Sequence, residues 1–247
     1  MSLFRWFLLA CLPLALLATS ACAGDALYLR WGDCPLGASQ TPVMGFACDT
    51  EAGEHALVCS FTTAQPVDSV LGVEVVVDLQ LSDAVLPDWW HLEPTGCRGD
   101  ALRADQSFGA ACQDVWLGLS SGGLLGYSVG MPRGGPNQAR ITVGFAVPSN
   151  QPRALNATDM YYAARLVLSN AGTASCSGCS GAACLVLESI QVLRPSRPPG
   201  APSGDVVITA PGAGNGNWAG WETLTSASCQ AVPVRTATWG QIKSLYR

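Results

Sequence analysis

The stretch that decides the fold is Val73–Leu81, VEVVVDLQL, in which two kinds of side chain alternate. Valine and leucine occupy every odd position, whereas Glu74, Asp78 and Gln80 fall on even ones. Successive side chains of a β-strand point to opposite faces, so a period of two predicts a strand with one buried and one solvated face. Such half-buried strands are typical of antiparallel sheets.

Three further segments carry strand-like sequence. Ile141–Val147 repeats the alternation. Cys184–Leu193 is rich in β-forming residues, but its phase slips near Ser189, which predicts a β-bulge. In the segment Met160–Leu168, alternate residues are expected on one face of a strand, and Arg165 on the other face. The residues of the first face are Met160, Tyr162, Ala164, Leu166 and Leu168.

Weaker strands complete the pattern, and turn formers separate them. They are predicted at Ala26–Trp31, Ala56–Thr62, Val115–Leu119 and Asp205–Thr209. The chain shows neither a long helical period before its end nor a repeat of fixed length. These features predict an all-β fold, an antiparallel β-sandwich of the jelly-roll or cohesin-like kind.

The N-terminus reads as a secretory signal at residues 1–23. Arg5 supplies the positive charge, Trp6–Ala18 the apolar run, and Ala21-Cys22-Ala23 a small-residue cleavage site before Gly24. Lipidation of Cys22 is the alternative, although Thr19 stands where lipoprotein signals carry a leucine-like residue. We expect a secreted chain, extracellular or at the cell surface, with the periplasm as a further option.

The remaining chain divides at a Pro/Gly-rich break, Arg194–Gly204. We expect a β-sandwich over residues 24–194 and an extension over 195–247 that packs on the sandwich or is tied to it. The extension ends in a predicted short helix capped by Thr238. Its apolar face could dock on the sandwich or serve as a sorting signal, and comprises Trp239, Ile242, Leu245 and Tyr246.

Nine of the 11 cysteines follow the signal, as in a disulfide-stabilised exported protein. Proximity favours Cys34–Cys48 and Cys97–Cys112. Cys176, Cys179, Cys184 and Cys229 then remain for two bonds, one of which reaches Cys229. Cys59 is left as a buried thiol. A zinc site built from Cys176, Cys179, Cys184 and Cys229 is the alternative, because the spacing of the first three resembles a zinc knuckle.

No catalytic or cofactor motif stands out. The chain has two histidines, His55 and His91, and neither has a partner at ligand or triad spacing. Paired carboxylates could hydrolyse glycosides, but the acids offer no preferred pair. The candidates are Asp78, Asp83, Asp88, Glu93, Asp100, Asp105 and Asp114. We therefore expect no enzyme activity, no cofactor and no metal.

Tryptophans are the better ligand-binding candidates, because exposed indole rings stack on sugars. Core packing is the alternative for each of them. Trp89 and Trp90 are adjacent, so in a strand they would point to opposite faces. The candidates are Trp89, Trp90, Trp116, Trp218 and Trp221.

Several short strings resemble a family of exported proteins from environmental bacteria, a resemblance that implies no activity and no site residues. They are LRWGDC (29–34), FACDT (46–50), LPDWW (86–90), the CSGC cluster (176–179) with CLVLESIQV (184–192), and TWGQIKSLYR (238–247). The strand order between Val73 and Leu193 is also loosely similar to cohesin-like and carbohydrate-binding-module sandwiches.

These observations predict a secreted, non-enzymatic protein that acts in binding or in cell-surface structure and adhesion. A carbohydrate-binding module that uses exposed tryptophans and a hydrolase that uses a carboxylate pair are the alternatives. Expected partners are a glycan or another surface protein. A net charge of −5 gives no electrostatic attraction for nucleic acid, and the mature chain contains no apolar run that would span a membrane.

Overall fold

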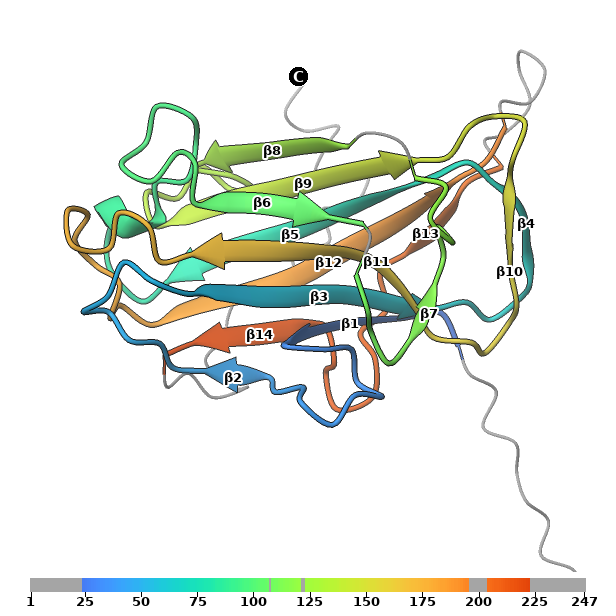
Figure 1. Cartoon of the computed structure of the whole chain (residues 1–247), viewed down its shortest axis with the longest axis horizontal. Coiled ribbons are helices and arrows are strands. Elements are labelled where there is room, and N and C mark those ends of the chain that lie inside the picture. The colour runs from blue at the N-terminus through green and yellow to red at the C-terminus, as the bar shows by residue number, and fades with distance from the viewer. Residues whose placement is uncertain (1–23, 107, 121–122, 196–203, 223–247) are drawn as a thin grey trace, which may run out of the picture.

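A computed structural model describes residues 24–106, 108–120, 123–195 and 204–222 as an antiparallel β-sandwich (Figure 1). Two sheets face each other across one apolar core, and within these ranges a single 3-10 turn, η1 (Asp88–Trp90), interrupts the strands. Among the described residues, no helix has the length and apolarity of a membrane-spanning segment.

One sheet has five strands. Its main order is β1 (Ala26–Trp31), β3 (Glu54–Thr62), β11 (Tyr161–Ser169) and β6 (Leu102–Asp105). The short β7 (Gln113–Asp114) runs parallel to β11. A separate pair, β4 (Val67–Val70) with β10 (Arg153–Leu155), stands at one end of the sandwich (Figure 1).

The other sheet has seven strands. Its main order is β2 (Val43–Met44), β14 (Trp218–Trp221), β12 (Ala183–Leu193), β5 (Gly72–Leu81), β9 (Gln138–Ala146) and β8 (Leu124–Val129). The short β13 (Val206–Ile208) also pairs with β12. Thus the described part of the expected extension, residues 204–222, contributes two strands to this sheet.

The predicted alternation builds the core. Val73, Val75, Val77 and Leu79 on β5 are each 1% exposed, and their neighbours on β9, such as Ile141 and Val143, are also buried. Residues directly opposite each other in neighbouring strands share a face, so this register aligns one continuous apolar surface toward the five-stranded sheet.

Most of the predicted strands are confirmed, with small shifts at their ends. The prediction for Val115–Leu119 is wrong: Leu117 and Gly118 adopt φ values of 47° and 73°, which turn the chain out of the extended conformation. The stretch Trp218–Trp221, for which no strand was predicted, forms β14.

Two bulges decide which face some side chains occupy. The predicted bulge near Ser189 is confirmed, because the register between β12 and β5 shifts between Leu187 and Ser189. A second shift, between Tyr162 and Ala164, has no signal in the sequence. It places Tyr162 opposite Ser60 on the outer face, and so corrects the prediction that Tyr162 shares the face of Ala164, Leu166 and Leu168.

The disulfides connect segments that are far apart in sequence: Cys34–Cys112, Cys48–Cys179 and Cys97–Cys176. The predicted pairs Cys34–Cys48 and Cys97–Cys112 are therefore wrong. Proximity in sequence misleads here because the sheet order brings distant loops together. With Cys176 and Cys179 oxidised, the alternative zinc site loses two of its thiolate ligands.

The remaining cysteines divide into three cases. Cys184 is disulfide-bonded. Of Cys176, Cys179 and Cys184, it alone remains compatible with the predicted bond to Cys229. Cys59 is a buried free thiol, as predicted. Cys229 and the expected helix face of Trp239, Ile242, Leu245 and Tyr246 lie outside the described residues.

Candidate functional site

The five candidate tryptophans do not form an exposed platform. Trp89, Trp90 and Trp221 are 0% exposed, Trp116 is 1% and Trp218 is 8% exposed. The expectation that either Trp89 or Trp90 reaches the surface is wrong, because both lie on the 3-10 turn η1 rather than on a strand. Both indoles therefore enter the core.

Hydrogen bonds explain how three of these polar indoles can be buried, whereas Trp90 Nε1 has no hydrogen-bond partner among the described residues. Trp89 donates its Nε1–H to Thr173 Oγ1 at 3.1 Å, Trp116 to the carbonyl of Ala163 at 3.0 Å, and Trp221 to the carbonyl of Cys179 at 2.7 Å. An N–H group that loses its contact with water on burial costs free energy unless it finds another acceptor, and these three groups have one. These side chains serve the stability of the sandwich.

Three of the five tryptophans, Trp89, Trp90 and Trp221, cluster at the end of the sandwich that carries two of the disulfides. Trp221 contacts Trp89 with ring centroids 4.6 Å apart and Trp90 at 5.3 Å. The guanidinium of Arg98 stacks on Trp89 at 3.6 Å and donates hydrogen bonds to the carbonyls of Trp89, Ala171 and Ser169. Burial lowers the pKa of Arg98 to about 10, and Glu51 opposes that shift.

Neither histidine is arranged as a general base for a nucleophile. His55 Nε2 lies 3.0 Å from Asn170 Oδ1, and its ring lies against Phe46. Burial lowers the pKa of His55, and the hydrogen bond to Asn170 opposes this. His91 Nδ1 lies 2.7 Å from Glu93 Oε1. Both imidazoles thus have structural partners.

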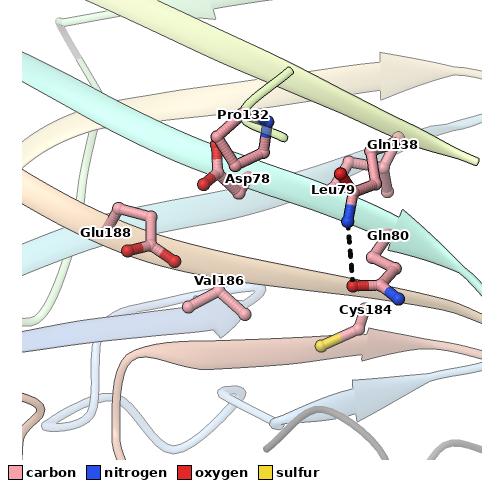
Figure 2. A pocket seen from close by; sticks show the side chains of 8 residues that line it. All are labelled: Asp78, Leu79, Gln80, Pro132, Gln138, Cys184, Val186 and Glu188. Atoms are coloured by element: carbon pink, nitrogen blue, oxygen red, sulfur yellow. Dashed lines mark hydrogen bonds between the residues drawn. The ribbon is translucent and has the colours of Figure 1, made fainter. Parts of the chain in front are cut away.

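A cluster of ionisable groups with one buried member, Asp78, lies on the outer face of the seven-stranded sheet (Figure 2). Asp78 of β5 and Glu188 of β12 come from adjacent strands, and Val186 of β12 lies opposite Asp78 in the register. Arg140 of β9 donates two hydrogen bonds to Asp78, at 2.6 and 2.8 Å. Asp78 is 7% exposed, and the guanidinium of Arg140 binds both of its carboxylate oxygens.

Amide groups form the other end of this pocket. Gln138 donates a long hydrogen bond of 3.4 Å to Gln80 Oε1, drawn dashed in Figure 2. Gln138 Oε1 is buried and has no hydrogen-bond partner. Within the described residues, the wall is completed by Leu79, Pro132, Cys184 and Val186. The cavity volume is about 10 Å³, enough for a single water molecule.

The two carboxyl groups have contrasting environments. Burial, together with the charge of Asp78, raises the pKa of Glu188, while Arg140 and Arg133 oppose the shift. Asp78 instead makes an ion pair with Arg140. One carboxyl group paired with a cation beside another that favours its protonated form is a pattern found at acid–base sites.

The other candidate acids are scattered. Asp105 bridges Arg103 and Arg165 on the five-stranded sheet, Glu93 pairs with His91, and Asp114 accepts a hydrogen bond from the backbone of Trp116. Asp83, Asp88 and Asp100 belong to connecting segments outside the strands. In the described ranges, no three His, Cys, Asp or Glu side chains converge to hold a metal ion.

Sequence reasoning named Asp78 but missed Glu188, Arg140 and Gln138. A signal existed for part of this set, because Asp78 interrupts the apolar run of a strand and a buried acid needs a cation on a neighbouring strand. The pairing of β5 with both β9 and β12 supplies those neighbours, and that strand order has no signature in the local sequence.

No protein-family model and no curated protein matches the sequence. Two solved structures share part of its shape. A cohesin module from the family 33 glycoside hydrolase of Clostridium perfringens ATCC13124 matches at 8% identity and a TM-score of 0.31, covering 76% of this chain and 98% of that one. AvmM, which catalyzes macrocyclization in alchivemycin A biosynthesis, matches at 10% identity and a TM-score of 0.34, covering 76% and 90%. At such TM-scores, neither likeness bears on what this chain does.

Proposed function

We propose that this chain is an exported β-sandwich that acts through its surface, either in binding or in cell-surface structure and adhesion, and not by catalysis. The observation that carries the proposal is the set of three disulfides, with sequence separations of 78, 131 and 79 residues. Disulfides persist in oxidising compartments, and the predicted signal at residues 1–23 would bring the chain there.

The arrangement of charged side chains also supports a role without chemistry. Arg140 and Asp78 connect β9 with β5, and Arg165 and Asp105 connect β11 with β6. These groups stabilise the sheets and are already occupied by partners. Loops that disulfides hold in place lose little freedom on contact with a ligand, which favours binding by a preformed surface.

Intact mass of the exported protein tests the premise of the proposal. We expect a chain that starts at Gly24, with a single free thiol at Cys59 that reacts with an alkylating reagent only after unfolding. Burial raises the pKa of Cys59 to about 12, which accounts for this inertness. A diacylglycerol on Cys22 would replace cleavage before Gly24 by membrane attachment, whereas several free thiols in the folded protein would contradict the proposal.

A retention assay with the oxidised mature protein tests the function itself. The protein is passed over immobilised polysaccharides, peptidoglycan and cell-envelope proteins, and the same incubations are analysed for released products. Retention without product release supports a glycan or a surface protein as the partner. Protein that is reduced and alkylated after unfolding provides the control and should not be retained. Released product would reject the non-enzymatic proposal.

A polymer hydrolase is the second candidate, and the contrast between Asp78 and Glu188 favours it. Such a hydrolase would use Glu188 as the acid and Asp78 as the second carboxyl group. The cavity of about 10 Å³ does not accommodate a sugar ring, so surrounding side chains would have to move for a substrate to enter. Product release that is lost in both Asp78→Asn and Glu188→Gln, with the fold intact by circular dichroism, would establish this candidate.

A further inference from the structure

Cys184 of β12 is disulfide-bonded, and its partner follows by elimination. Three disulfides join six of the other cysteines in pairs, and Cys59 is a free thiol. Cys11 and Cys22 belong to the predicted signal and leave with it. Of the 11 cysteines in the sequence, Cys229 is therefore the one that can hold Cys184 in the mature chain.

The position of Cys184 places this anchor on the sheet. Gly220 of β14 lies opposite Cys184 in the register, and β14 ends one residue later, at Trp221. Cys229 follows eight residues after Trp221, and at up to about 3.6 Å per residue this length lets the chain turn back to Cys184. Cys184 lines the same cavity as Gln80, on the outer face of the sheet (Figure 2). The segment after β14 is consequently attached to this outer face.

An apolar cluster surrounds the anchor and is separate from the core between the sheets. Cys184 and Trp218 are 3% and 8% exposed, and Val43 and Val186, which pack against them, are half-buried. We call these four residues the outer cluster. Trp218 lies opposite Val186 in the register, so both side chains share the face that points away from the five-stranded sheet. Because the two sheets enclose the core on the other side, burial of this indole calls for a separate cover.

Charge favours the segment after β14 as that cover. Residues 223–247 contain three cationic side chains, Arg235, Lys243 and Arg247, and no acidic one. Residues 24–222 contain nine arginines and 18 acidic residues, so their net charge is −9. The outer face contributes Glu74, which is exposed, and Glu188, which is half-buried. Attraction between unlike charges thus draws the segment toward the sandwich and favours this face.

We infer that residues 223–247 cover the outer cluster, held there by a disulfide between Cys184 and Cys229. Nine residues separate Cys229 from Trp239, enough chain for the predicted terminal helix to fold back over the cluster. A helix of about ten residues is marginal by itself and gains its stability from the packing of an apolar face. The side chains that would pack on the outer cluster are Trp239, Ile242, Leu245 and Tyr246.

The cover also restricts access to the cavity beside Asp78. Cys184 and Val186 belong both to the outer cluster and to the wall of that cavity. A segment bonded to Cys184 therefore lies next to the cavity. A ligand of the oxidised protein would meet a surface other than this part of the seven-stranded sheet.

Two measurements on the oxidised mature protein test the inference. Peptide mapping without reduction should recover Cys184 and Cys229 in disulfide-linked peptides. Hydroxyl-radical footprinting then compares the full chain with a variant that ends at Gln230 and so keeps the anchor. Oxidation of Trp218 should increase severalfold in the shortened variant, because its cover is removed. Trp221, which is 0% exposed in the core, is the internal control and should stay unreactive.

A matched pair of full-length variants tests the apolar contact itself. Ile242→Glu/Leu245→Glu places two charges on the face that packs on the outer cluster, whereas Gln241→Glu/Ser244→Glu adds the same charges on the opposite side of the predicted helix. The first variant should raise the oxidation of Trp218 severalfold, and the second should leave it as in the wild type.

The possible results divide clearly. The inference is overturned by a reduced Cys184, by its bonding to any cysteine other than Cys229, or by equal oxidation of Trp218 in the full and shortened chains. Oxidation of Trp218 that falls as protein concentration rises would identify a second copy as the cover and overturn it too. If the shortened variant exposes Trp221, it has unfolded, and the two double variants then decide: equal oxidation of Trp218 in both rejects the cover.

Discussion

The two outer faces of the sandwich differ in how they are covered, although both belong to strands that alternate in sequence. On the five-stranded sheet, the outward residues Val58, Ser60 and Tyr162 are 1%, 0% and 2% exposed. On the seven-stranded sheet, Glu74 is exposed and Val76 half-buried. Asp78 is buried there, in an ion pair with Arg140.

A disulfide-bonded loop accounts for part of the difference. Phe108, four residues before Cys112, stacks on Tyr162 with ring centroids 4.2 Å apart, and the guanidinium of Arg165 lies over the Phe108 ring, 4.6 Å from its centroid. Cys112 is bonded to Cys34 and donates its backbone N–H to Cys34 Sγ at 2.8 Å. The comparison teaches that alternation identifies residues that share a face, but does not say whether that face meets water.

Removal of the Cys34–Cys112 bond should have the largest effect on the difference in coverage between the two outer faces. The double variant Cys34→Ala/Cys112→Ala should lose about 4 kcal/mol of unfolding free energy, because the bond closes a loop with a separation of 78 residues. Urea unfolding measures the loss, and hydrogen exchange should show Tyr162 and its neighbours less protected. Cys48→Ala/Cys179→Ala is the control: it should lose a similar free energy without reduced protection at Tyr162. An equal loss of hydrogen-exchange protection at Tyr162 in both double variants would contradict the covering of Tyr162 by the disulfide-bonded loop.

A matched pair of valines gives a smaller effect. Val58→Ala should destabilise the protein by about 2 kcal/mol, because two methyl groups leave a covered site. Val207→Ala, at a site that is 56% exposed, should change the unfolding free energy by less than about 0.5 kcal/mol. Urea midpoints of both variants provide the measurement. Similar losses would mean that the outer face of the five-stranded sheet is open in solution.

The smallest effect concerns Glu188 and pH. Burial and Asp78 raise the pKa of Glu188, so the folded state holds this proton more tightly than the unfolded chain. Its contribution to stability is complete below the unfolded pKa of about 4.3 and is lost as pH rises through the folded pKa. Glu188→Gln should therefore gain up to about 1 kcal/mol over the wild type between pH 4 and pH 7, a limit that allows for solvent screening of a half-exposed group.

Unfolding free energies of this variant and the wild type at both pH values provide the test. Glu74→Gln, an exposed glutamate on the same face of β5, is the control and should show a smaller change with pH. A Glu188→Gln variant that loses stability on going from pH 4 to pH 7, relative to the wild type, would contradict the arrangement of Glu188 beside Asp78.

Local patterns were sufficient to predict the strands with the clearest alternation. Val73–Leu81 could be assigned to a strand because its valines and leucines recur at every second position. The bulge near Ser189 was visible as a slip in the same pattern. The second bulge, before Ala164, was not visible, because Tyr162 is apolar enough to suit either face. Strands of two to four residues, such as β2 and β6, are too short to show any period.

The candidate site could be predicted only in part. Asp78 stood out as an acid inside an apolar strand, but its partner Arg140 is 62 residues away and joins it through the pairing of β5 with β9. The tryptophans misled for a related reason. Tryptophan suits both a sugar-binding platform and a core. Trp89 and Trp90 are buried because η1, a 3-10 turn, directs both side chains inward.

By itself, the sequence determined the fold class, the position and inward face of the long strands, and the isolation of Cys59 as a buried thiol. Only the tertiary structure decided the order of the strands, the disulfide partners, the burial of the tryptophans and the meeting of Asp78, Arg140 and Glu188. The physical reason is that periodicity reflects the geometry of one strand and its contact with water. Contacts between distant segments depend on which strands become neighbours, and that choice is made by the packing of the whole sandwich.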